Sequence, residues 1–131
     1  MHTIEATQAI LEELVAELPA ALFSGLNGGV SLTERAPLHE QSQPGRPLYV
    51  LGAYHRDSLG RYVLLHYGSL RRCFGHLPHD AYVSELRRVL RHELRHHVES
   101  LAGEHGLIDF DREQIAAYLT ETADLGTPPQ G

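Results

Sequence analysis

Two histidines and a glutamate lie within five residues of one another and could bind and use a metal ion. The segment HELRH, residues 92–96, matches the pattern H-E-x-x-H. Residues four apart lie about one turn apart on one face of a helix, so the imidazoles of His92 and His96 can converge on one cation. Glu93 is rotated by roughly 100° from His92, which directs its carboxylate beside the ion and suits a general base.

This arrangement predicts a hydrolytic reaction that needs a bound ion. A zinc ion held by few protein ligands keeps a position for water and lowers the pKa of that water to about 7. Glu93 would accept the proton and deliver it to the leaving amine, while the ion polarises the scissile carbonyl. We therefore predict Zn²⁺ as the cofactor, Glu93 as the catalytic residue, and peptide-bond hydrolysis without a covalent intermediate. The same ligands also suit manganese, iron, cobalt or nickel.

The sequence leaves the third protein ligand open. Glu99 lies one turn beyond His96 on the same face, and a glutamate in a helix leans towards the N-terminus, so its carboxylate could reach the ion. Glu99 could instead form an ordinary ion pair with Arg95. A site without a third protein ligand is a further alternative. The other candidates are acids downstream, which a turn would bring back to the ion: Asp109, Asp111 and Glu113.

A long helix must carry the motif. Apolar residues at steps of four and three predict a helix from Asp80, as N-cap, to about Ala102, with Gly103 as C-cap. His92 and His96 face away from these apolar residues, so one face packs into the core and the other displays the ligands. The apolar stripe consists of Tyr82, Leu86, Leu90, Leu94, Val98 and Leu101.

Several polar residues have plainer interpretations than metal binding. His92 and His96 could belong to a solvated helix face beside Arg91 and Arg95. His97 points some 140° from His92, so a hydrogen bond or a surface position is expected for it. Histidines and tyrosines in the central segments are expected as ordinary strand residues, with a role in a cleft as the alternative. They are His55, His66, Tyr54, Tyr62 and Tyr67.

The rest of the chain predicts a small α+β fold. Apolar spacing predicts a first helix over residues 3–17, with Thr3 as N-cap. A short strand is expected at residues 30–34, and a surface loop at residues 35–47. The strand residues of 48–56 and 61–70, separated by turn-forming residues, predict a β-hairpin.

Length and charge limit the other possibilities. The 131 residues suit one domain, expected over residues 1–125 and ending in a helix at about 111–122, with a flexible tail at 126–131. The net charge of −6 argues against nucleic-acid binding. The single cysteine, Cys73, requires no oxidising compartment, and neither a secretory signal nor a membrane span is recognisable. We expect a cytoplasmic protein whose partner is a peptide or unstructured protein; the oligomeric state is not indicated.

Three segments together resemble the small bacterial zincin-like metallopeptidases described as minimal zincins: LPAALFSGLNGGVSL, LYVLGAYHRDSLGRYVLLHYGS and HELRHHVESLAG. The resemblance covers roughly residues 4–113. It implies an about three-stranded sheet, fed by the hairpin, packed on the motif helix, with the edge strand binding an extended substrate. It also implies His92 and His96 as ligands and Glu93 as base.

The sequence departs from better-known relatives after the motif. A metzincin continuation, HExxHxxGxxH, would need Gly at position 99 and His at position 102, where this chain has Glu99 and Ala102. The third ligand therefore cannot be carried over from that group. The alternative to an enzyme is a catalytically silent metal-binding or regulatory domain on the same scaffold. Glu93 favours the enzyme, because metal storage has no use for a base beside the ion.

Overall fold

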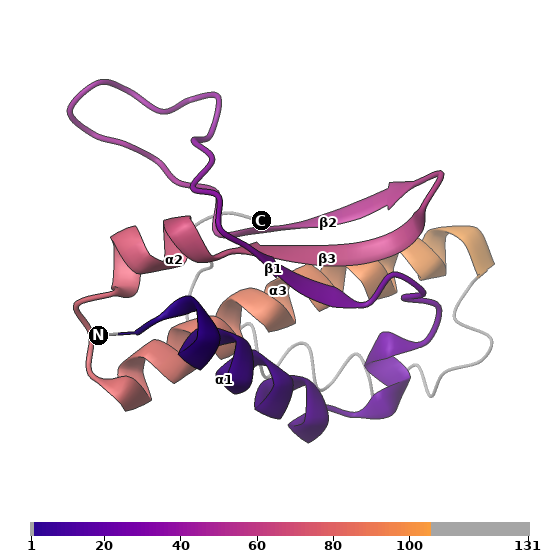
Figure 1. Cartoon of the computed structure of the whole chain (residues 1–131). Helices are drawn as coiled ribbons and strands as arrows, with labels where there is room; N and C mark the ends of the chain where they lie inside the picture. Colours follow the sequence, from indigo (N-terminus) through magenta and orange to yellow (C-terminus); the bar gives the residue numbers. More distant parts are fainter. Residues whose placement is uncertain (1, 106–131) are drawn as a thin grey trace.

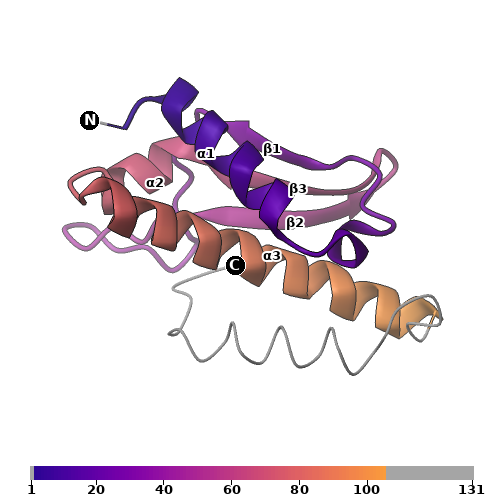
Figure 2. The same cartoon turned by 90° about the horizontal axis from the view of Figure 1, so that it is seen from below.

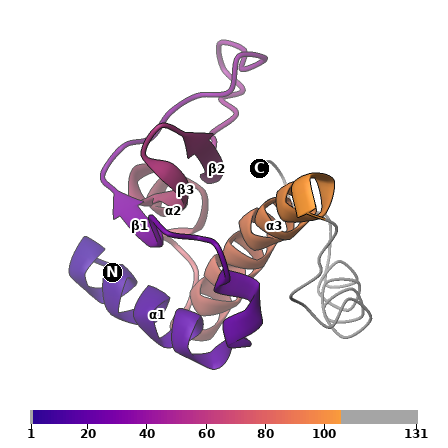
Figure 3. The same cartoon turned by 90° about the vertical axis from the view of Figure 1, so that its right-hand side faces the viewer.

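A three-stranded sheet and the helices packed on one of its faces form the described part of the chain (Figure 1). The computed structural model describes residues 2–105. Helices α1 and α3 lie on the same face of the sheet, and they run side by side beneath it (Figures 2 and 3). The predicted α+β class is confirmed.

Helix α1, Ile4–Glu17, forms where the sequence predicts it. The Thr3 hydroxyl accepts a hydrogen bond from the Ala6 backbone N–H at 3.0 Å, so the predicted N-cap is confirmed. A short 3-10 helix, η1, follows at Ala20–Phe23. The buried apolar residues of α1 recur at helical spacing and pack in the core: Ile10, Leu11 and Leu14.

The sheet has the strand order β1-β3-β2. Strand β1 is Val30–Thr33, β2 is Gly52–Asp57 and β3 is Gly60–His66. Strand β1 pairs with β3 in parallel, and β2 pairs with β3 in antiparallel, so the predicted short strand and hairpin are confirmed. Strand β2 lies at the edge of this sheet and against α3.

Both strands of the hairpin are shorter than predicted. The first begins at Gly52 and not at residue 48. The second ends early. The prediction continued it to residue 70, but helix α2, Tyr67–Phe74, begins after His66. Tyr67 favours a strand locally, whereas burial at Leu70 and partial burial at Phe74 follow helical spacing. A close tertiary contact accompanies the turn, because a Cβ at Gly68 would lie 2.6 Å from the carbonyl oxygen of Arg35.

Helix α3, His79–His105, carries the motif and runs along β2 and β3. Its start and end differ from the prediction: Asp80 lies in the first turn and is not the N-cap, and Gly103 lies inside the helix and is not the C-cap. A carboxylate in the first turn still stabilises the helix through its dipole, and one glycine costs only about 1 kcal/mol in a helix. The whole predicted apolar stripe is buried.

A second buried row on α3 faces the sheet and contains polar residues. Val89, Glu93 and His97 follow one another at steps of four, and all three are buried. The close approach of strand and helix is visible at Gly52, where a Cβ would lie 3.2 Å from a methyl group of Val89. The motif glutamate therefore belongs to the core-facing side of α3.

One apolar core joins α1, the sheet and α3 across the described residues. The expected domain end at residue 125, the last helix at 111–122 and the tail at 126–131 lie outside the described residues. Within residues 2–105, none of the helices has the length and apolar character that crossing a membrane requires.

Gly60→Ala is expected to lower the free energy of unfolding by about 1–3 kcal/mol. Gly60 has φ +108°, and a Cβ there would lie 2.3 Å from the side-chain nitrogen of Asn27. The Asn27 side chain also accepts a hydrogen bond from the Arg61 backbone N–H at 2.9 Å, which the substitution would disturb. Urea unfolding followed by circular dichroism measures the loss.

Gly45→Ala is the matched control, because Gly45 has φ +82° but no atom within 4 Å of a Cβ. It carries the backbone strain of about 1–2 kcal/mol without the crowding. Equal losses in the two variants would mean that the Asn27 contact contributes nothing.

Candidate metal and catalytic site

The rings of His92 and His96 meet edge to face on one side of α3. Their Nε2 atoms lie 3.2 Å apart, and their ring planes make an angle of 85°. Two nitrogen ligands at the usual distance from a tetrahedral zinc ion are separated by about 3.3 Å. The two residues therefore fit a divalent ion with little movement, and in the metal-free form one ring can donate its N–H to the other.

His92 is held in the form that a metal ion requires. Burial lowers its pKa, and electrostatic interactions with the neighbouring His96, Arg95 and Arg88 lower it further. Its Nδ1 atom is buried and has no hydrogen-bond partner among the described residues. A neutral imidazole is the ligand form of histidine, so this environment favours metal binding over protonation.

Glu93 is a fully buried carboxylate, with 0% of its surface exposed. Neither carboxylate oxygen has a hydrogen-bond partner among residues 2–105. Burial raises the pKa of Glu93 to about 7. The backbone N–H of Tyr54 opposes this rise without reaching hydrogen-bond geometry. A carboxylate with a pKa near neutrality suits a general base that must both accept and return a proton.

Glu99 is not brought to the gap between the two histidine Nε2 atoms. Its carboxylate lies 4.0 Å from Nδ1 of His96, on the other edge of the ring, and 66% of its side chain is exposed. In the part of the chain that the structure describes, no group of three potential ligands forms. The other candidates, Asp109, Asp111 and Glu113, lie outside the described residues.

His97 has a structural environment that the sequence predicts only in part. The ring is fully buried, so the alternative of a surface position is wrong, while the expected hydrogen bond is confirmed. Nε2 lies 2.7 Å from the backbone oxygen of Ser24, and Nδ1 lies 2.9 Å from the hydroxyl of Tyr54. Burial lowers the pKa of His97, which favours the neutral ring.

The remaining histidines and tyrosines of the hairpin region have partners of their own. His55, Tyr62 and His66 lie in strands as expected, whereas Tyr67 begins helix α2, so the expected strand position is wrong for it. His55 stacks on Tyr62 at 5.0 Å between ring centroids, and the Tyr62 hydroxyl donates to Asp57 at 2.7 Å. His66 hydrogen-bonds through Nδ1 to the Thr33 hydroxyl at 2.9 Å. The Tyr67 hydroxyl donates to the backbone oxygen of His2. These contacts engage the hydroxyl groups of Tyr62 and Tyr67, which argues against an oxyanion role for either.

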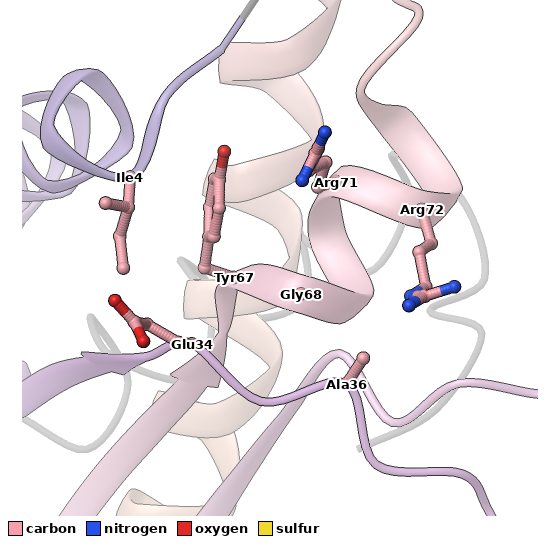
Figure 4. Close-up of a pocket in the computed structure, with 7 residues that line it drawn as sticks. All are labelled: Ile4, Glu34, Ala36, Tyr67, Gly68, Arg71 and Arg72. Carbon is pink, nitrogen blue, oxygen red and sulfur yellow. The ribbon is translucent and has the colours of Figure 1, made fainter.

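A pocket away from the motif is formed with the unpredicted helix α2. It measures about 610 Å³ and lies between the start of α1, the segment after β1 and α2 (Figure 4). Its charged lining residues are Glu34, Arg71 and Arg72, which are exposed. Tyr67 lines this pocket, whereas His92, Glu93, His96 and Glu99 do not.

Comparison with known proteins finds similarity to a solved structure. No family model and no curated protein matches the chain. A structure described as a conserved hypothetical protein from Thermus thermophilus is similar, with a TM-score of 0.65 and 32% sequence identity. The similarity covers 77% of this chain and 98% of that one, so it includes nearly the whole of the Thermus protein.

Proposed function

We propose that this chain, which belongs to the same family as the conserved hypothetical protein from Thermus thermophilus, is a zinc-dependent metallopeptidase. The description of the Thermus protein names no activity, so the proposal depends on the site in this chain. The observation that carries it is the pair of Nε2 atoms at 3.2 Å, on the same helical turn as a carboxylate whose pKa is about 7.

The proposed roles follow from the protonation states. When bound, zinc supplies a Lewis acid that polarises the scissile carbonyl and makes a water molecule more acidic. His92 and His96 would hold the ion in their neutral forms. Glu93 accepts a proton from the attacking water and then donates it to the leaving amine, and a pKa near 7 makes both transfers accessible near neutral pH.

The edge strand β2 is the proposed binding surface for an extended peptide. His66 donates to the carbonyl of Leu51, and backbone groups alternate in direction along an antiparallel strand. Gly52, Tyr54 and Arg56 therefore direct their N–H and C=O groups to the outer edge, where an added peptide strand would pair with them. The Tyr54 N–H faces Glu93, so we infer that the scissile bond lies level with Tyr54.

A second candidate is a silent metal-binding or regulatory domain on the same scaffold. Two observations favour it: the Glu93 carboxylate is fully buried, and the described residues supply two ligands without a third. Catalysis would require the Glu93 side chain to move enough for water to reach the carboxylate. The cost of keeping a glutamate at this position favours the enzyme, because an unpaired buried carboxylate destabilises the fold and a silent site gains nothing from it.

Zinc titration of metal-free protein tests the site itself. Wild type is expected to bind one zinc ion, and His92→Ala and His96→Ala are each expected to weaken binding by more than about 100-fold. Even the hydrogen-bond partners of metal ligands contribute about 10- to 100-fold, and a direct ligand contributes more. Isothermal titration calorimetry with a competing chelator gives the affinities.

His55→Ala is the matched control. His55 stacks on Tyr62 of the hairpin and is neither one of the two proposed zinc ligands nor the proposed base. It should bind zinc like wild type. A wild type that binds no zinc, or alanine variants at positions 92 and 96 that bind it normally, would contradict the proposal.

A further inference from the structure

A chain of hydrogen bonds connects the hairpin, the motif helix and the segment after η1. Arg61 on β3 donates to the hydroxyl of Tyr54 on β2 at 3.1 Å. This hydroxyl lies 2.9 Å from Nδ1 of His97, and Nε2 of His97 lies 2.7 Å from the backbone oxygen of Ser24. The chain thus crosses from the sheet to α3 and ends on a backbone carbonyl.

The direction of these hydrogen bonds is fixed by their two ends. The carbonyl of Ser24 can only accept, so Nε2 of His97 must carry the proton that it donates. The neutral ring then has Nδ1 as an acceptor, and the Tyr54 hydroxyl must donate to it. The hydroxyl oxygen in turn accepts from Arg61. Each of the three hydrogen bonds has one direction, so the His97 ring has a defined tautomer and orientation.

Both the backbone and the side chain of Tyr54 lie against the same turn of α3. Its backbone N–H faces the carboxylate of Glu93, while its side chain reaches His97, four residues further along the helix. The rings of Tyr54 and His97 also pack at 5.4 Å between centroids. Because His97 is fully buried and bonded at both nitrogens, it is a rigid anchor for the strand.

We propose that Tyr54 is a positioning residue, which holds the edge strand β2 at a fixed distance from Glu93 through its hydrogen bond to His97. The inference rests on the proposed function, because it assigns this spacing a role in placing a bound peptide against the base. The Tyr54 hydroxyl does not act on the substrate, since it is already shared between His97 and Arg61. Its contribution is the spacing between β2 and α3.

Tyr54→Phe tests this role, because it removes the hydroxyl and keeps the ring that packs on His97. The expected result is a fall in kcat of about 10- to 100-fold, the range in which a displacement of about 1 Å reduces catalysis. The KM should change less than kcat, and zinc affinity should stay within about twofold of wild type. Nitrogen NMR of the His97 ring should show the lost hydrogen bond at Nδ1.

Tyr62→Phe is the matched control, because it removes an exposed tyrosine hydroxyl bonded to Asp57 within the hairpin. It should leave kcat, KM and zinc affinity unchanged. A Tyr54→Phe protein that has lost the Nδ1 bond but turns over peptide like wild type would overturn the inference and leave the proposed function standing. A zinc-loaded wild type without peptide turnover would overturn both.

Discussion

Glu93→Gln is expected to reduce peptide hydrolysis by about 10²- to 10⁴-fold while zinc is still bound. Glutamine has nearly the same shape as glutamate but cannot accept a proton from water, and the ion is held by His92 and His96. Hydrolysis of a broad peptide library, followed by mass spectrometry, measures the activity. Metal analysis of the same samples measures the zinc content.

Glu13→Gln is the control for this substitution, because Glu13 is an exposed residue of α1 and is far along the chain from the motif. It should retain both zinc and activity. If Glu93→Gln turned over peptide as fast as wild type, the base would be another group. If zinc-loaded wild type cleaved nothing in the library, the silent metal-binding domain would be the better account.

The same substitution is expected to stabilise the metal-free protein above neutral pH. The pKa of Glu93 rises from 4.5 to about 7 on folding, so between these values the folded protein keeps a proton that the unfolded chain releases. The free energy of unfolding therefore falls as pH rises from about 4.5 to about 7, and it remains low above that. The corresponding penalty is about 3 kcal/mol.

Urea unfolding in the presence of a chelator measures this effect. At pH 8 Glu93→Gln should be more stable than wild type by up to about 3 kcal/mol, less whatever the buried amide loses by lacking partners. At pH 4.5 the two proteins should be nearly equal, because Glu93 is then protonated in the folded state. Glu13→Gln should show no such dependence. Parallel pH curves for Glu93→Gln and wild type would mean that the carboxylate is solvated in the folded protein.

Together the two results would describe one residue with opposed effects on activity and stability. A charged, buried carboxylate without hydrogen bonds destabilises the folded state, and proteins often retain such groups at sites where chemistry requires them. Binding of zinc beside Glu93 is expected to offset part of the penalty through its positive charge. A stability gain on zinc addition that is larger in wild type than in Glu93→Gln would reveal this coupling.

The helices and strands whose apolar residues recur at one clear spacing could be predicted from the sequence. The apolar stripe of α3 predicts its buried face, and the residues flanking the turn at Gly60 predict the hairpin. Helix α2 could not be predicted, because Tyr67 continues the strand-forming run of β3 and the helix is accompanied by tertiary packing of Gly68 against Arg35. In a short segment such tertiary contacts can outweigh the local preference for a strand.

In the candidate site, too, local spacing could be predicted from the sequence and tertiary contacts could not. The convergence of His92 and His96 follows from helical spacing, so the motif predicted it. The burial of Glu93 and His97 depends on β2 lying over the flank of α3, which no local pattern encodes. Val89, Glu93 and His97 each lie one position before a residue of the apolar stripe. This row could have suggested that the buried face of α3 is wider than the stripe. The third ligand stays a prediction, because it depends on contacts beyond those described.

Strand β2 must also avoid pairing with other copies of the same protein. A row of backbone donors and acceptors at a sheet edge is a template for aggregation, and short length and charged side chains limit that risk. Strand β2 has six residues, and its last two, Arg56 and Asp57, are charged and exposed. The strand can therefore receive an extended peptide over a few residues while offering two folded molecules little length for sheet growth.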